Sequence, residues 1–247
     1  MACVSDLRGL VVDWGGVLTP SLDGAMAAWA RHDGVRFEHF EQALHAWTRP
    51  VEDAASGPVD GVGGVGYGRG AQEPVAALEQ AEGVGWSPVH RLERGELSVP
   101  DFERALAAEL ARLGSPVEPQ GLLRRMLGGL DDLEEDMIGL VRRAHAAGLR
   151  TALLSNSWGD GDYPAQLWDG LFDELVISGR VGMRKPDPDI FRYTCSLLDL
   201  PPSACVMVDD LPRNIAGAVR VGMVGVLHRA YASTVEELEI LFGVPLR

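Results

Sequence analysis

The segment LRGLVVDWGGVLTP, residues 7–20, decides the fold of this chain. It opens with a short apolar run that ends at Asp13, and runs of this length are typical of strands buried on both faces of a parallel sheet. Asp13 therefore lies at the carboxyl end of the predicted strand, where open α/β sheets bind ligands. Gly15 and Gly16 follow, and glycine lets backbone N–H groups approach an anion closely. An aspartate at a strand end is also a common turn or helix cap, so Asp13 alone establishes no site.

A second apolar run, LRTALLSNS at residues 149–157, predicts another strand of the same kind. It follows an amphipathic helical pattern over residues 134–148, and strands that alternate with helices predict an α/β fold with a parallel sheet. The run ends in Ser155 and Asn156, whose hydroxyl and amide groups are suited to binding a phosphate oxygen.

A third run, ACVMVDD at residues 204–210, ends in the adjacent carboxylates Asp209 and Asp210. Two acids side by side at the ligand edge of a sheet repel each other unless a cation lies between them. Their hard oxygen atoms suit Mg²⁺, which prefers near-octahedral oxygen coordination and keeps several waters. An acidic pair that merely begins a helix is the alternative, because acids are favourable near a helix N-terminus.

Lysine occurs once, at Lys185, among the 22 Lys and Arg residues of the chain. It lies in GMRKPDPDIF (182–191), where Gly182, Pro186 and Pro188 indicate a defined turn. An ammonium group is a compact point charge, able to bridge two anions in a tight site where the planar guanidinium of arginine fits poorly. An arginine-rich composition leaves a single lysine by chance in some sequences. Lys185 alone therefore establishes no site, and the other motifs must support its role.

Taken together, these segments resemble the haloacid dehalogenase-like (HAD) hydrolase superfamily. The resemblance rests on four motifs: DWGGV (13–17), LLSNS (153–157), the lysine of GMRKPDPDIF (182–191), and VDDLPRNIAGAVRVGM (208–223). It implies a Rossmann-like parallel sheet with helices on both faces and an inserted helical cap. The expected division is an α/β core at 1–20 and 130–247 and a cap at 21–129.

The resemblance also implies a metal site and a nucleophile. Asp13 would attack phosphorus and form a phospho-aspartyl intermediate that water hydrolyses. Mg²⁺ would be bound by the carboxylates of Asp13 and Asp210 and the main-chain carbonyl of Gly15, with Asp209 contacting it through water. Asn214 is expected to tie the metal-binding loop rather than to bind the ion.

Four groups are expected to bind the phosphoryl oxygens. Lys185 would bridge these oxygens and Asp13, and Ser155 would donate its hydroxyl. The backbone N–H groups of Trp14 and Asn156 would hold the remaining oxygens. The expected substrate is a small phosphorylated metabolite.

Gly15 departs from the commonest pattern of the family. Most HAD phosphatases have a second aspartate two residues after the nucleophile, which protonates the leaving oxygen. Loss of such a general acid typically costs 10²- to 10⁴-fold in rate, unless the leaving group needs little help or another group supplies the proton. The expected cap contains four histidines that are candidate donors, although each is more typical of a surface or packing residue: His32, His39, His45 and His90.

Two other functions stay open beside the phosphatase. A 2-haloacid dehalogenase uses the same aspartate without metal or general acid, which is compatible with Gly15. That reaction does not need the carboxylate pair Asp209 and Asp210. A catalytically silent phosphate-binding or regulatory protein would equally explain the missing acid.

The predicted cap contains helical patterns at 22–31, 37–48, 73–82 and 99–113. Ser98 is expected to be the N-cap of the last helix and Gly114 to end it. Residues 57–70 contain a GxGxxG arrangement, but no strand precedes it, so a loop is favoured over a dinucleotide site. The position of this loop in the predicted cap leaves a lid role open.

Composition excludes several classes of partner. The net charge of −14 argues against nucleic acid and anionic membranes, and no stretch reaches the roughly 18 apolar residues that span a bilayer. The absence of a signal-peptide pattern before the first strand predicts a cytoplasmic protein.

Three cysteines without metal-ligand spacing are expected to be reduced thiols with no catalytic role. No feature predicts an oligomeric state.

Overall fold

The computed structural model of the 247-residue chain describes residues 6–48, 87–128, 132–159, 163 and 170–247. Its centre is a five-stranded parallel sheet with the order β3-β2-β1-β4-β5. The strands are β1 (Gly9–Val12), β2 (Arg150–Ser155), β3 (Glu174–Ile177), β4 (Cys205–Asp209) and β5 (Val224–Leu227). β1 is the middle strand, so both neighbouring strands end beside Asp13.

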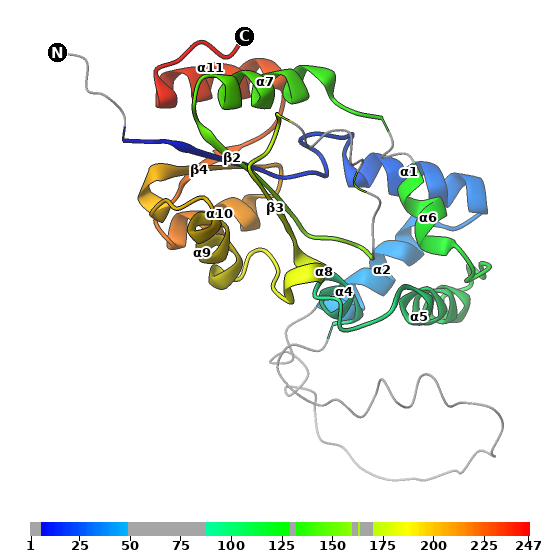
Figure 1. The fold of residues 1–247 in the computed structure, drawn as a ribbon. Helices are drawn as coiled ribbons and strands as arrows, with labels where there is room; N and C mark the ends of the chain where they lie inside the picture. Colours follow the sequence, from blue (N-terminus) through cyan, green and yellow to red (C-terminus); the bar gives the residue numbers. More distant parts are fainter. Residues whose placement is uncertain (1–5, 49–86, 129–131, 160–162, 164–169) are drawn as a thin grey trace, which may run out of the picture.

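Helices cover both faces of the sheet (Figure 1). On one face, α7 (Glu135–Ala146) and α11 (Tyr231–Phe242) pack with Leu10 and Val12 of β1 in one hydrophobic cluster. On the other, α9 (Pro188–Leu197) and α10 (Pro212–Arg220) pack with Val11. Alternate β1 side chains thus enter opposite clusters, as the period of a strand requires. The predicted α/β class, with a parallel sheet and helices on both faces, is confirmed.

A separate hydrophobic cluster joins the helices before α7. These helices are α1 (Leu22–Asp33), α2 (Phe37–Thr48), α4 (Pro88–Glu93), α5 (Val99–Arg112) and α6 (Leu122–Leu127). Figure 1 shows them gathered beside the carboxyl edge of the sheet. Phe102 and Leu106 are fully buried in this cluster. All five helices lie within residues 21–129, whose definition as a cap domain stays a prediction.

Most of the predicted helical segments are observed with small differences in their ends. The patterns at 22–31 and 99–113 correspond to α1 and α5, which end at Asp33 and Arg112. Ser98 is the N-cap of α5, because its hydroxyl accepts a hydrogen bond from the backbone N–H of Asp101, and Gly114 has a φ of 91°. The predicted helix at 73–82 and the glycine-rich stretch at 57–70 lie outside the described residues.

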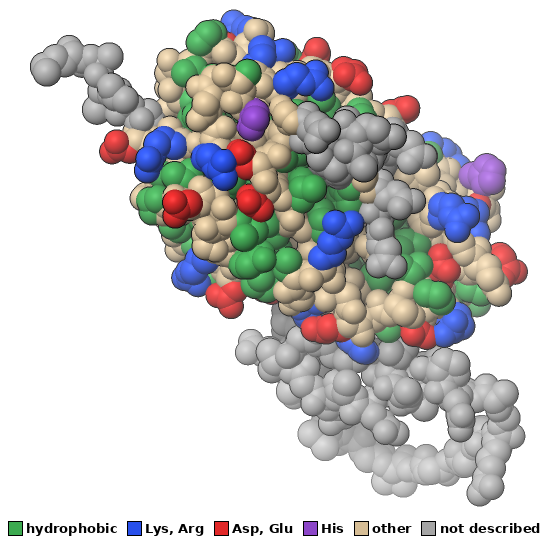
Figure 2. Space-filling view, viewed as in Figure 1, with side chains coloured by type: hydrophobic (Ala, Val, Ile, Leu, Met, Phe, Trp, Pro, Cys, Tyr) green, Lys and Arg blue, Asp and Glu red, His purple; other side chains and the backbone are tan. Residues whose placement is uncertain are grey.

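A short helix, α8 (Ser178–Val181), follows β3 and leads into the loop that carries Lys185. No helix in the described part of the chain is long and apolar enough to cross a membrane. Basic and acidic side chains are interspersed on the face that Figure 2 shows.

Candidate active site

The carboxyl edge of the sheet brings three carboxylates together. Asp13 follows β1, and Asp209 ends β4 and precedes Asp210. One carboxylate oxygen from each of the three lies within 4.8 Å of the others. The parallel register places Val12 opposite Val208, and the backbone N–H of Asp13 continues the ladder to the carbonyl of Val208 at 2.9 Å. The adjacent strand ends therefore fix the spacing of the carboxylates.

Lys185 lies between two of these carboxylates. Its Nζ atom is 2.8 Å from Oδ1 of Asp13 and 2.7 Å from Oδ2 of Asp209, and its side chain is 1% exposed. Burial by itself would lower the pKa of Lys185, but the charges and hydrogen bonds of Asp13 and Asp209 outweigh it and raise the pKa above its usual range. The side chain is therefore a fixed ammonium group that bridges two anions.

Asp209 accepts hydrogen bonds from three different residues. Its Oδ1 accepts hydrogen bonds from the backbone N–H of Leu211 at 2.9 Å and from Asn214 Nδ2 at 3.0 Å. Its Oδ2 accepts from Lys185 Nζ at 2.7 Å and from Asn214 Nδ2 at 3.1 Å. A carboxylate offers about four lone-pair sites, so these four hydrogen bonds occupy the acceptor sites of Asp209. Asn214 ties the loop through Asp209, as the sequence predicts.

The charge of Lys185 does not neutralise Asp13 and Asp210 in addition to Asp209. Burial raises the pKa of Asp13 to about 7, with Lys185 opposing the rise and Asp209 adding to it. Burial, followed by the charge of Asp209, raises the pKa of Asp210 to about 6. Three carboxylates face one ammonium group, and the donor atoms are hard oxygens. The arrangement fits a divalent cation at Asp13 and Asp210.

The two glycines after Trp14 differ in what they permit. Gly16 has a φ of 74°, and a Cβ atom there would collide with Oδ2 of Asp210. Glycine at this position is thus a condition for the close approach of Asp210 to the loop after β1. At Gly15, a Cβ atom would lie 3.3 Å from Cδ1 of Leu22, the far end of a flexible side chain. A side chain at position 15 therefore needs only a small shift of Leu22.

Ser155 is the last residue of β2, and Asn156 begins the loop that follows it. The side-chain amide of Asn156 donates to the carbonyl of Lys185 at 3.0 Å and accepts from the Lys185 backbone N–H at 2.8 Å. This double hydrogen bond fixes the lysine loop against the end of β2. The backbone N–H of Trp14, predicted to bind a phosphoryl oxygen, donates in this structure to Oδ1 of Asp13 at 2.7 Å.

Tyr163 is a site residue that the sequence analysis missed. Its hydroxyl donates to Oγ of Ser155 at 2.8 Å, and its ring packs edge-on against Trp14 with 5.3 Å between centroids. Burial raises its pKa above the usual value. No periodic pattern or motif in the sequence connects position 163 with Ser155, so only the fold reveals this contact.

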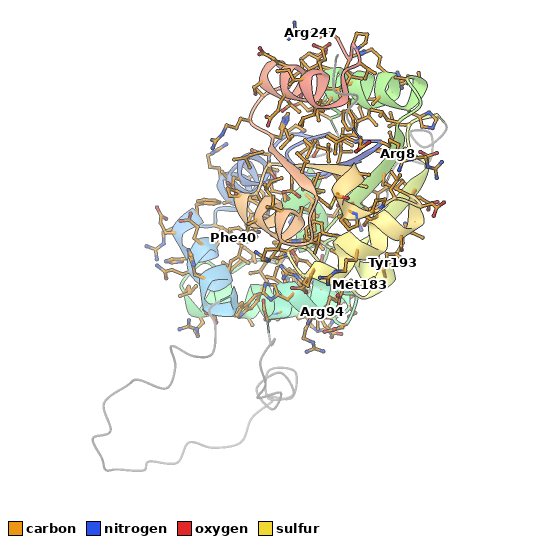
Figure 3. The ribbon with its side chains drawn as sticks, turned by 90° about the vertical axis from the view of Figure 1, so that its left-hand side faces the viewer. Arg8, Phe40, Arg94, Met183, Tyr193 and Arg247 are labelled. Atoms are coloured by element: carbon orange, nitrogen blue, oxygen red, sulfur yellow. The ribbon has the colours of Figure 1, made fainter. Side chains whose placement is uncertain are left out.

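Glu93 of α4 makes a second contact that the sequence did not predict. Its Oε2 pairs with Nε of Arg184 at 2.5 Å, and both side chains are less than a tenth exposed. The hydroxyl of Ser178 donates to the Glu93 carbonyl at 2.5 Å. Because Arg184 precedes Lys185, this contact connects α4 to the lysine loop. Figure 3 labels Arg94, which follows Glu93 at the end of α4, and Met183, which precedes Arg184 on the other side of this contact.

The four candidate histidines lie away from these contacts. His32 bonds to Asp33, and His39 is buried and bonds to Ser115. His45 is exposed on α2. His90 is half-buried, and burial together with the charges of Arg184, Arg94 and Arg213 lowers its pKa to about 4. In the described residues, none of the four is hydrogen-bonded to the three carboxylates of the site or to Lys185.

A cavity of about 460 Å³ lies between the α4–α5 connection and the core. Its apolar wall includes Leu92, Leu97, Val99 and Ile177. Ser157 also lines it, two residues after Ser155, so the cavity adjoins the end of β2, which carries the site hydroxyl.

The chain belongs to the haloacid dehalogenase-like hydrolase family, whose model matches residues 7–222. Among curated proteins, the sesquiterpene phosphatase of Aspergillus oryzae is 27% identical over 62% of this chain and 78% of that protein. Rat bifunctional epoxide hydrolase 2 is 37% identical over 39% of this chain. The alignment spans only 19% of the epoxide hydrolase, and the first curated relatives are matched over 10% to 30% of their length.

The fold is also shared with solved structures. A HAD family enzyme from Bacteroides thetaiotaomicron, solved with magnesium and inorganic phosphate, superposes with a TM-score of 0.55. The match covers 91% of this chain and 95% of that one at 18% sequence identity, a level that establishes the fold alone.

Proposed function

We propose that the chain is a Mg²⁺-dependent phosphatase that hydrolyses a small-molecule phosphate monoester through a phospho-aspartyl intermediate on Asp13. The observation that carries this proposal is the placement of Lys185 between Asp13 and Asp209, with Asp210 beside them. A nucleophile, a fixed cation and metal-ligating carboxylates thus meet at one edge of the sheet. The sesquiterpene phosphatase of Aspergillus oryzae supports the same reaction class.

The metal would be held by Asp13, Asp210 and the carbonyl of Gly15. Bound Mg²⁺ would neutralise charge on the phosphoryl group and on the attacking carboxylate. The magnesium and phosphate in the Bacteroides thetaiotaomicron enzyme support this choice of ion. Since the oxygens of Asp209 already accept four hydrogen bonds, we assign Asp209 to holding Lys185 rather than to a water-mediated metal contact.

Asp13 performs two successive steps in this proposal. An oxygen of its carboxylate forms a bond to phosphorus as the bond to the leaving oxygen breaks, and water then hydrolyses the acyl phosphate and regenerates Asp13. Trp14 N–H and Lys185 both bond to Oδ1 and so fix the direction of the carboxylate. Lys185 and Ser155 stabilise the negative charge on the transferred phosphoryl group. Such electrostatic stabilisation, together with positioning, supplies most of the catalysis of phosphoryl transfer.

Residues 21–129 form the cap in this proposal, and the core is 1–20 with 130–247. The separate hydrophobic cluster of α1, α2, α4, α5 and α6 supports this division. The cavity between α4, α5 and the core would then receive the organic part of a small phosphorylated metabolite.

The test of the function is hydrolysis of a generic aryl phosphate in the presence and absence of Mg²⁺. We expect phosphate release with Mg²⁺ and its abolition by EDTA, with recovery when Mg²⁺ is restored. Release of halide from a 2-haloacid in EDTA would instead establish the dehalogenase, with which Gly15 is compatible because that reaction needs no acid. Binding of phosphate without turnover of any ester would establish the catalytically silent alternative.

Gly15 leads to a second expected result. Without an acid at position 15, the departing oxygen carries more negative charge in the transition state, so the rate should depend steeply on leaving-group pKa. Anomeric sugar, aryl and acyl phosphates should therefore be preferred over primary-alcohol phosphates. Gly15→Asp should flatten the dependence, because a Cβ atom at this position meets only Leu22.

The measurement is the single-turnover rate for a series of esters of graded leaving-group pKa at saturating Mg²⁺. Gly15→Asn is the control, since it adds the same bulk without an acidic proton. A flat series in the unsubstituted protein would show that another group already donates the proton.

A further inference from the structure

We propose that Tyr163 is a positioning residue that turns the hydroxyl hydrogen of Ser155 toward the phosphoryl group. This inference rests on the proposed phosphatase function and adds a residue to it. Ser155 is 3% exposed at the end of β2 and accepts a hydrogen bond of 2.8 Å from the Tyr163 hydroxyl. The contact joins the two hydroxyl groups directly.

The direction of this hydrogen bond decides what Ser155 offers to a ligand. A serine hydroxyl has one hydrogen and two lone pairs, and a phenol has a pKa near 10. The phenol is the more acidic of the two hydroxyls and hence the better donor. When Tyr163 donates, one lone pair of Ser155 is used and its hydrogen is left to donate elsewhere. A donor is what a phosphoryl oxygen requires.

The surroundings of Tyr163 hold it in this role. Its ring packs at 69° against Trp14, whose backbone N–H bonds to Asp13, so the phenol is fixed beside the nucleophile. Burial, together with the nearby charge of Asp13, raises the pKa of Tyr163 despite the hydrogen bond to Ser155. The phenol therefore stays protonated and remains a donor throughout the neutral range.

Tyr163 does not replace the acid missing at position 15. Its hydrogen is committed to Ser155, and a phenol with a raised pKa is a weak acid for a leaving oxygen. A positioning role and an acid role consequently differ in a measurable way. Loss of a general acid steepens the dependence on leaving-group pKa, whereas loss of positioning lowers all rates by the same factor.

The experiment is a double-mutant cycle of Tyr163→Phe and Ser155→Ala, assayed with aryl phosphates at saturating Mg²⁺. Tyr163→Phe keeps the ring on Trp14 and removes only the hydroxyl. We expect it to lower kcat/KM by roughly 10-fold in the unsubstituted background, the scale of one hydrogen bond, and by less than about 2-fold in the Ser155→Ala background. The slope against leaving-group pKa should not change.

Tyr193→Phe is the matched control, because Tyr193 is exposed on α9 and should alter neither rate nor melting temperature. Equal losses from Tyr163→Phe in both backgrounds would overturn the inference, as would normal kinetics or a steeper slope. Those outcomes leave the phosphatase intact, since the unsubstituted protein still turns over. An unsubstituted protein that hydrolyses no phosphate ester would overturn both proposals.

Discussion

Replacing Lys185 with arginine is expected to lower kcat/KM by at least ~100-fold in a protein that still folds, a loss of about 2.7 kcal/mol in transition-state stabilisation. The ammonium lies 2.8 Å from Asp13 and 2.7 Å from Asp209 with 1% of its side chain exposed. A guanidinium group is larger and planar, and it cannot bridge both oxygens from the same position. The measurement is steady-state kinetics together with circular dichroism.

A reverse substitution provides the control for this prediction. Arg192→Lys exchanges the same two side chains at an exposed ion pair with Asp189, where pairs contribute little to stability. It should leave kinetics and melting temperature unchanged. Near-normal turnover in Lys185→Arg would mean that any buried cation suffices, and the choice of lysine would then carry no functional meaning.

Asp210→Asn is expected to lower turnover by about 10³-fold, which corresponds to about 4 kcal/mol. The substitution removes a charged oxygen ligand and leaves the size of the side chain unchanged. Binding of Mg²⁺, followed by isothermal titration calorimetry, should weaken in parallel. Asp189→Asn is the control, because this carboxylate is exposed and pairs with Arg192 on the surface.

Thermal stability separates a metal ligand from a structural carboxylate. The pKa of Asp210 is raised to about 6, so at neutral pH its ionised form costs stability in the absence of a cation. In EDTA, Asp210→Asn should thus melt no lower than the unsubstituted protein. Added Mg²⁺ should stabilise the unsubstituted protein only. Equal stabilisation of both proteins by Mg²⁺ would contradict the assignment.

The fold was predictable from the sequence because each step has a local signal. The apolar runs that end at Asp13 and Asp209 are continuous, and such runs predict strands buried on both faces. Parallel strands share one carboxyl edge, so the polar residues that follow them had to meet there. The cap of α5 at Ser98 was likewise encoded by neighbouring residues.

The remaining features depend on residues that meet only after folding. Glu93 and Arg184 are 91 positions apart, and nothing in either segment indicates the other. The saturation of Asp209 by Asn214, Leu211 and Lys185 likewise required coordinates. The cytoplasmic location and the division into core and cap stay predictions, because no contact among the described residues tests them.

The solitary lysine also determines how this chain responds to amine-directed chemistry. Apart from the amino group that begins these 247 residues, Lys185 is the one primary amine that they offer to an acylating reagent. It is buried and held as an ammonium group by two carboxylates, and an amine reacts as a nucleophile only when neutral. Acylation of its side chain should thus require the carboxyl edge of the sheet to open. The rate of that modification therefore measures how often the site opens.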